Sequence, residues 1–129
     1  MNGVWLRASA ALGALAGGTG VVLAAVTTHA LKPHLDAEAL TTLDTASRYL
    51  LIHGLLLMVI ARWQQSYRDA VALKAATSFA AMGIVLFCGG LSASIISGVR
   101  WLGAAAPLGG SALIGAWLAC LVFALTDLQ

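Results

Sequence analysis

The side chains whose chemistry suits a binding or proton-transfer site gather around one histidine, His53. It is the only ionisable residue well inside a long apolar stretch, and ionisable groups inside a membrane span mark functional sites by default. Tyr49 precedes it by four residues and so shares its face of a helix. Asp44 and Arg48, one turn further out, have opposite charges at i,i+4 spacing. Together with His29, these residues predict a polar cluster near one mouth of a helical bundle.

Three interpretations of these side chains remain open at the level of sequence. In the first, they form a hydrogen-bonded cluster that fixes how neighbouring helices align. In the second, they bind a ligand or handle protons, with His53 as the group that changes charge. In the third, His29 and His53 ligate a haem, although a helix that enters the membrane near Ala46 places His53 about 10 Å deeper than His29.

The sequence contains none of the familiar catalytic or metal-binding motifs. No Cys/His spacing matches a zinc site, and neither a glycine-rich phosphate loop nor a nucleophile elbow occurs. The two cysteines, Cys88 and Cys120, are too few for a disulfide framework and are expected to be small core residues. We therefore expect no enzymatic activity, no bound metal and, apart from the haem alternative, no cofactor.

The composition indicates what kind of protein must position these residues. Of 129 residues, 60% belong to the hydrophobic set and only 9% are charged, with a mean hydropathy of +0.93. A soluble domain is about 45–50% apolar and about 25% charged, so the charged residues here cannot cover a water-soluble fold. A formal net charge of +2 is also too low for a nucleic-acid binder. The chain is expected to be an integral membrane protein.

Four apolar stretches approach the roughly 20 residues that a membrane helix needs. They cover residues about 5–28, 46–63, 75–96 and 107–125 of a single domain, 1–129. Before the second stretch, residues 36–45 place apolar side chains at helical spacing between polar ones, and Asp36 and Glu38 are acids of the kind that begin helices. The sequence predicts an all-α, integral membrane four-helix bundle with an amphipathic segment in the first loop.

An even number of spans places both termini on the same side of the membrane. Basic residues on that side outnumber those on the other by four to three: they are Arg7, Arg62, Arg68 and Lys74 against Lys32, Arg48 and Arg100. The positive-inside rule then places both termini in the cytoplasm. Either a bacterial or a mitochondrial inner membrane fits the sequence, and the alanine-rich composition favours the bacterial one.

One tryptophan is expected far from the membrane surface. Trp117 lies ten residues past Pro107, about 15 Å into the bilayer at 1.5 Å per residue. Because a buried indole N–H needs an acceptor, we expect a hydroxyl or a carbonyl of a facing helix beside it.

Small residues recur every four positions in three of the four stretches. Lipid tails are as apolar as leucine, so close approach of backbones at small residues drives helix association in a bilayer. We expect such contacts at Gly13, Gly17, Gly89 and Gly115, and at Gly109 and Gly110 behind Pro107, which suits a first helical turn. The bulky side chains of the second stretch, from Leu50 to Ile60, are expected to face lipid or another protein.

Several short motifs occur in a characteristic order. His29-Ala30-Leu31-Lys32 follows a glycine-rich first span, Tyr49 and His53 open the second, and Pro107-Leu108-Gly109-Gly110 opens the fourth. In this order they resemble the domain of unknown function 423 family, small bacterial inner-membrane proteins (YgdD-like) that are similar to eukaryotic transmembrane protein 256. Thr27 and Thr28 depart from the small residues that this family has before the histidine. The resemblance implies a four-helix membrane protein, but neither an established activity nor catalytic residues.

These observations favour a protein that interacts with other membrane proteins. We expect an accessory or stabilising subunit of a larger membrane complex, whose partners are the lipid bilayer and other subunits or copies of itself, and not nucleic acid. The alternative is an oligomeric carrier of a small solute or ion that uses His53. Small four-helix exporters couple protons through an acid in the first span, however, and none of the five acids here lies within an apolar core. A haem- or quinone-associated protein is the third hypothesis.

Overall fold

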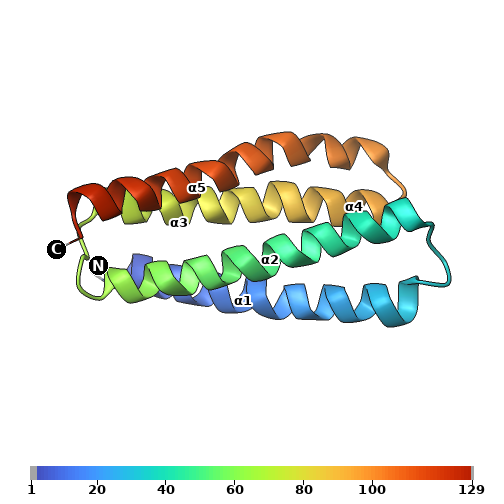
Figure 1. Ribbon diagram of the computed structural model, residues 1–129, viewed down its shortest axis with the longest axis horizontal. Coiled ribbons are helices and arrows are strands. Elements are labelled where there is room, and N and C mark those ends of the chain that lie inside the picture. Colours follow the sequence, from blue (N-terminus) through green and yellow to red (C-terminus); the bar gives the residue numbers. More distant parts are fainter. Residues whose placement is uncertain (1–2, 129) are drawn as a thin grey trace.

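Each apolar stretch forms one long helix, and the four helices run antiparallel along a common axis (Figure 1). The structure, a computed structural model, describes residues 3–128. The elements are α1 (Val4–Val26), η1 (Thr27–Leu31), α2 (Ala37–Gln64), α3 (Val71–Gly83), η2 (Ile84–Gly89), α4 (Gly90–Ser97), η3 (Arg100–Ala105) and α5 (Ala106–Thr126). Two of them, η1 and η2, are π-helical turns within longer helices, so α3, η2 and α4 form one third span, Val71–Ser97. The predicted four-helix, all-α fold is confirmed.

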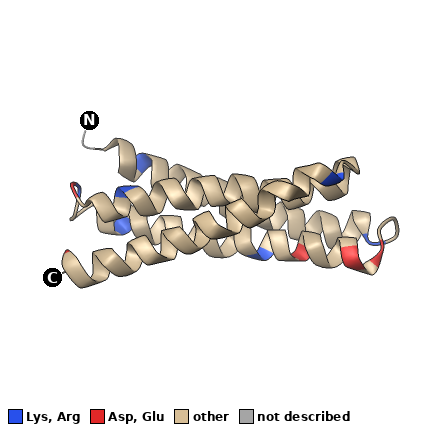
Figure 2. Cartoon of the chain, turned by 90° about the horizontal axis from the view of Figure 1, so that it is seen from above, with Lys and Arg blue, Asp and Glu red and all other residues tan. Residues whose placement is uncertain are grey.

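The four helices are longer than the hydrocarbon core of a bilayer. Each apolar helix has 27 or 28 residues, or about 40 Å at 1.5 Å per residue, against a core of about 30 Å. Most charged residues lie toward the two ends of the bundle (Figure 2), whereas Asp44 and Arg48 lie two to three turns into α2. The start of α1 and the end of α5 lie at the same end (Figure 1), which we call the terminal end.

The first two helices approach each other through their backbones. A Cβ built on Gly13 of α1 would lie 2.8 Å from the carbonyl oxygen of Gly54, and a Cβ built on Gly54 would lie 2.8 Å from the backbone nitrogen of Gly17. Neither position accepts a side chain unless the helices move apart. Further along, the hydroxyl of Ser47 donates to the carbonyl of Gly20 at 2.8 Å. Small residues thus bring α1 and α2 into the close contact that stabilises helix pairs in lipid.

The third span and α5 form a second close pair. A Cβ built on Gly109 would lie 2.8 Å from the backbone carbon of Leu86, and one built on Gly83 would lie 2.9 Å from the backbone nitrogen of Leu113. Pro107 occupies the first turn of α5, as predicted, where its missing N–H costs no helical hydrogen bond.

The other glycines that were expected at helix contacts differ in what they face. A Cβ on Gly115 would lie 3.3 Å from the ring of Phe79, and a Cβ on Gly110 would lie 3.7 Å from the ring of Phe87. The expectation of a helix contact at Gly89 is wrong, because its Cβ position meets no atom within 4 Å. The Cβ position of Gly17 is equally open, so Gly17 contacts α2 through its backbone alone. The four-residue spacing identifies one face of the helix. At Gly89, the last residue of the π turn η2, this face points away from the bundle.

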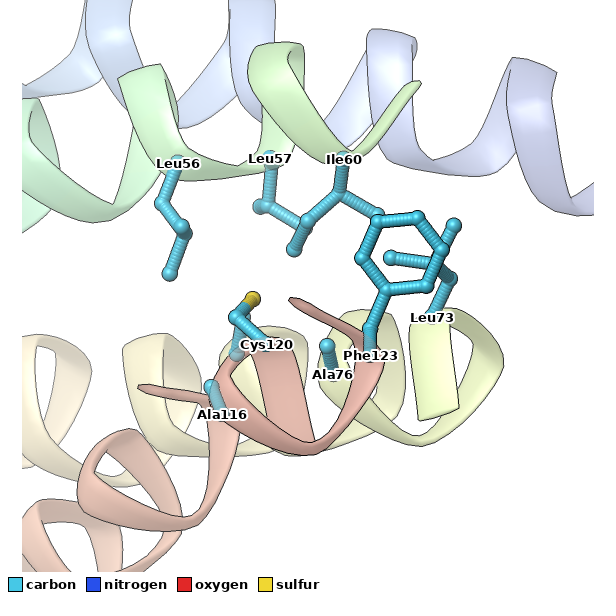
Figure 3. Packing of buried hydrophobic residues seen from close by; sticks show 9 residues of the cluster. Leu56, Leu57, Ile60, Leu73, Ala76, Ala116, Cys120 and Phe123 are labelled. Atoms are coloured by element: carbon cyan, nitrogen blue, oxygen red, sulfur yellow. The ribbon is translucent and has the colours of Figure 1, made fainter. Parts of the chain in front are cut away.

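The second helix is the central element of the bundle. Its bulky residues fill the core with residues of α3 and α5 (Figure 3); they are Leu56, Leu57 and Ile60 against Leu73, Ala76, Ala116, Cys120 and Phe123. The expectation that they face lipid or another protein is therefore wrong for this half of α2. Leu50, too, is buried at 6% exposure, whereas Leu55 and Met58 do lie on the surface. The reason is that α2 packs against α1, the third span and α5, so that a larger share of it is buried than of any other span.

The first loop is shorter than predicted. The first helix continues to Leu31 through the π turn, and α2 begins at Ala37, so only residues 32–36 connect them. The predicted amphipathic segment therefore forms the first turns of α2 rather than a separate element of the loop. The carboxylate of Asp36 accepts a hydrogen bond from the backbone nitrogen of Ala39 at 2.8 Å, which confirms the predicted helix start and satisfies an otherwise unpaired donor.

Candidate functional site

A histidine and a tryptophan form a hydrogen-bonded pair near the middle of the bundle. The indole Nε1–H of Trp117 on α5 donates to Nε2 of His53 on α2 at 3.1 Å, and His53 is only 3% exposed. The other ring nitrogen, Nδ1, lies 2.9 Å from the carbonyl oxygen of Tyr49. An indole N–H can only donate and a carbonyl can only accept. Nε2 is therefore bare and Nδ1 carries the hydrogen, so this geometry requires the neutral Nδ1–H imidazole.

Two further aromatic rings, from α2 and from the third span, extend this pair. Tyr49 stacks on His53 with ring centroids 5.8 Å apart, and Phe87 of η2 lies 4.9 Å from Tyr49. The rings of Trp117 and His53 lie in an edge arrangement with their centroids 6.2 Å apart. The expectation that Trp117 needs a partner inside the bundle is correct, but the partner is an imidazole rather than a hydroxyl or a carbonyl. We call Tyr49, His53, Phe87 and Trp117 the aromatic cluster.

The five residues that were predicted to form one polar cluster divide into three groups. Tyr49 and His53 belong to the aromatic cluster. Asp44 and Arg48 form an ion pair of 2.9 Å whose side chains are 52% and 72% exposed, respectively. His29 is exposed in the π turn at the end of the first span.

The packing of α1 on α2 also separates the two histidines. Because Gly13 lies beside Gly54 in this antiparallel pair, His53 lies level with Ala14. His29 is fifteen residues further along the first helix, or about 22 Å at 1.5 Å per residue. In this arrangement the two imidazoles cannot reach one iron, so the haem site based on this pair is not formed. Nor do any three His, Cys, Asp or Glu side chains within residues 3–128 come close enough to hold a metal ion.

A second polar cluster, not predicted from the sequence, lies one turn inside the terminal end. At its centre, Oγ1 of Thr77 donates its hydrogen to the carbonyl of Leu73 at 3.0 Å. Thr77 must therefore accept its other two bonds, from Oγ of Ser9 at 2.8 Å and from Nε2 of Gln64 at 3.2 Å. Ser9, Gln64 and Thr77 are at most 2% exposed. Each of these three residues lies near the same end of its apolar helix. This common depth is the signal in the sequence that would have indicated a contact among them.

The amide of Gln64 has one unused atom. Its Nε2 is held by Thr77, and its Oε1 is buried without a hydrogen-bond partner among residues 3–128. If the amide turned round, its oxygen would face a hydroxyl that has already donated its only hydrogen, so the observed orientation is the favourable one. A buried acceptor without a donor costs about 1–3 kcal/mol. Oε1 is therefore a buried acceptor whose need for a hydrogen-bond donor is unmet within residues 3–128.

A hollow of about 430 Å³ lies next to this amide. We call it the terminal hollow, and it is lined by Val4, Trp5, Leu6, Gln64, Arg68, Asp69 and Lys74. It brings together the start of α1, the end of α2 and the first turn of α3. A polar ligand of small size fits a site with this mixture of charged, polar and aromatic side chains.

An apolar groove of about 510 Å³ runs between α1 and the third span. We call it the lateral groove, and residues that line it include Leu15, Ala16, Thr19, Val85, Gly89 and Ser92. The hydroxyl of Ser92 is buried there without a partner among the described residues. The two helices beside the groove are the least covered by the rest of the bundle. In an apolar segment of 18 residues from each span, 22% of the first span and 17% of the third span are buried, against 50% of the second.

Comparison with known proteins identifies the family. Residues 23–110 match the family model described as "Protein of unknown function (DUF423)". This segment runs from the last turns of α1 to the first turn of α5 and contains His29, Tyr49 and His53. No solved structure matches the chain significantly.

Three relatives are membrane proteins by name. The chain is 32% identical to the UPF0382 membrane protein YwdK of Bacillus subtilis over 113 residues, 88% of this chain and 92% of that protein. It is also 32% identical to a UPF0382 membrane protein of Staphylococcus epidermidis over 86% of this chain and 89% of the relative. The UPF0382 membrane protein of Haemophilus influenzae is 30% identical over 81% and 83%, respectively. With four helices that can cross a bilayer, the chain is an integral membrane protein that belongs to the DUF423 family.

Proposed function

We propose that the protein is a non-enzymatic subunit of a larger assembly in the inner membrane, and that it holds a transmembrane helix of another membrane protein in the lateral groove. The observation that supports this most directly is Gly89, whose Cβ position faces open space at the groove. A glycine on an outer face lets the backbone of a second helix approach closely, and such contacts drive helix association in lipid.

Polar atoms of the groove suit the same role. Thr19 lines the groove from α1, and the buried hydroxyl of Ser92 lacks a partner within the described part of the chain. Hydroxyls of this kind form hydrogen bonds between transmembrane helices. The sparse coverage of α1 and of the third span leaves enough apolar surface on both sides for a helix to lie between them.

A carrier that uses His53 has less support. Both ring nitrogens are engaged, and a proton on Nε2 would face the indole N–H of Trp117, which is itself a donor. A transport cycle that protonates His53 must therefore first break this pair. A haem role for His29 and His53 has less support still, because the two residues lie about 22 Å apart. In the lateral groove, the described residues offer a quinone only the hydroxyls of Thr19 and Ser92 as oxygen ligands.

The first test is purification from native membranes under gentle conditions, followed by mass spectrometry. The wild-type protein is expected to co-purify with one other membrane protein in fixed stoichiometry. Gly89→Leu should reduce the yield of that protein about fivefold or more, because overpacking a helix contact costs about 1–3 kcal/mol. Open space around Gly89 allows this variant to fold normally. Ala124→Leu, at an exposed position of α5 away from the groove, is the matched control.

Photo-crosslinking locates the contact. A photoreactive residue in place of Val85, which lines the groove and is 68% exposed, should form an adduct with the same protein. One in place of Leu121, 53% exposed on α5, should not. The proposal would be contradicted if wild type and all variants purified without a partner protein. It would also be contradicted if only the photoreactive residue in place of Leu121 formed an adduct. A His53→Ala variant that assembles normally but loses a transport signal would favour the carrier instead.

The remaining part of the proposal concerns orientation. We place both termini in the cytoplasm, which is supported by the excess of basic residues at the terminal end and by the common position of the two chain ends (Figure 1).

A further inference from the structure

The terminal hollow carries charges that form no ion pair with any other described residue. Arg68 and Lys74 bring two positive charges to it, and Asp69 brings one negative charge. None of the three takes part in an ion pair within residues 3–128. Two positive charges and one negative charge leave the hollow with a local charge of +1, which suits a ligand with a single negative charge.

The hollow lies at the depth of lipid headgroups. Gln64 is the last residue of α2, and Trp5 is the second residue of α1. Helices of about 40 Å in a core of about 30 Å extend about 5 Å beyond the hydrocarbon at each end. Trp5, 40% exposed, belongs to the residue type that is enriched at this interface. Phospholipid headgroups therefore surround the hollow.

The free atom of Gln64 specifies what the ligand must contain. Its Oε1 needs a donor, whereas the oxygens of a phosphodiester only accept. Arg68 and Lys74, in contrast, need an acceptor of negative charge, and a phosphodiester supplies it. A ligand that satisfies the whole site carries a phosphodiester and a hydroxyl in one molecule.

We propose that the terminal hollow binds the headgroup of a hydroxylated anionic glycerophospholipid, of which phosphatidylglycerol is the simplest. Its phosphodiester lies between Arg68 and Lys74, and a headgroup hydroxyl donates to Oε1 of Gln64. The single negative charge of this lipid matches the local charge of the hollow. The apolar side of the hollow, from Leu6 and the ring of Trp5, faces the glycerol and the first acyl carbons.

Native mass spectrometry of the full chain with added phosphatidylglycerol tests the charge requirement. The double variant Arg68→Gln, Lys74→Gln should bind this lipid about 25-fold more weakly, since each cation near a membrane surface contributes about fivefold. Arg62→Gln is the matched control, because Arg62 is exposed in the last turn of α2 but does not line the hollow. Equal binding of phosphatidylglycerol by the double variant and by the control would overturn the proposal.

A second lipid tests the hydroxyl requirement. Phosphatidylmethanol has the same charge and acyl chains as phosphatidylglycerol but lacks headgroup hydroxyls. Wild type should prefer phosphatidylglycerol about fivefold, the value of one net hydrogen bond. Gln64→Met should lose this preference and still bind phosphatidylmethanol, because the cations remain. A variant that merely misfolds would lose both lipids, and wild type that binds both equally would overturn the role of Gln64.

Soluble competitors distinguish a lipid from a free phosphate ester. Glycerol 3-phosphate carries a phosphate group and hydroxyls, and inorganic phosphate carries the phosphate alone; neither has acyl chains. Neither should displace phosphatidylglycerol at millimolar concentration, because the apolar contacts of Trp5 and Leu6 are missing. Displacement by glycerol 3-phosphate at the affinity of the lipid would overturn the assignment to a lipid.

Discussion

The indole hydrogen of Trp117, on the last span, is donated to Nε2 of His53, on the second span, over 3.1 Å. This bond joins the two helix pairs of the bundle, since His53 belongs to the α1–α2 pair and Trp117 to the pair formed by the third span and α5. It also determines which nitrogen of His53 carries the hydrogen, because the carbonyl of Tyr49 accepts from the other one. A polar bond between pairs specifies one alignment where apolar side chains alone would allow several.

Trp117→Phe removes the donor and keeps an aromatic ring. We expect this variant to be about 0.6–2 kcal/mol less stable than wild type, the range for hydrogen bonds between membrane helices. Trp101→Phe is the control, since Trp101 is 74% exposed. Thermal unfolding in one detergent, followed by the loss of monodisperse protein, compares the variants. Equal midpoints for the two would show that the bond adds nothing.

Gly13→Ala tests the contact between the backbones of α1 and α2. The new methyl group would lie 2.8 Å from the carbonyl oxygen of Gly54, so the helices must move apart. Overpacking of this kind costs about 1–3 kcal/mol. Gly18→Ala, in the same helix, meets nothing within 4 Å and should be neutral or slightly stabilising. A midpoint of Gly13→Ala at or above that of Gly18→Ala would contradict the contact.

Thr77→Val tests the buried cluster at the terminal end. The substitution keeps the shape of the side chain but leaves Ser9 and Gln64 without their partner. The free energy of unfolding should fall by about 1–3 kcal/mol. Thr41→Val is the control, because the exposed hydroxyl of Thr41 bonds only to the carbonyl of Ala37 in its own helix. Similar stability of both variants would mean that the cluster is unimportant for folding.

Thiol labelling tests the orientation. In a chain whose buried Cys88 and Cys120 are replaced by alanine, single cysteines are introduced as Ser66→Cys, in the turn between α2 and α3, or as His34→Cys, in the turn between α1 and α2. An impermeant reagent should label His34→Cys in intact cells, and should label Ser66→Cys only after the membrane is opened. The reverse pattern would place the termini outside.

Features that depend on a short piece of sequence were predictable. The length of the apolar stretches determines the number of spans. Asp36 caps α2 and Pro107 opens α5 as predicted, because each acts on the backbone of its own first turn. The depth of Trp117 and its need for an acceptor also follow from its place along one helix.

Features that depend on how helices face each other were not predictable from spacing. Gly54 makes a close backbone contact but lies among bulky residues, which concealed its role. Gly89 has the expected spacing, yet its side of the helix meets no neighbour. The bond between Ser9 and Thr77 joins residues 68 positions apart, and its existence depends on the rotation of both helices. A single sequence contains no measure of that rotation.

The pairing of His53 with the last span has a consequence for biosynthesis. A nascent chain is made from its N-terminus, so α1 and α2 can meet at Gly13 and Gly54 before Trp117 has left the ribosome. Until α5 arrives, Nε2 of His53 has no indole donor, and an unsatisfied polar group in hydrocarbon costs several kcal/mol. A chain that stops before α5 retains this defect permanently. The unpaired imidazole thus distinguishes a chain without α5 from the complete bundle.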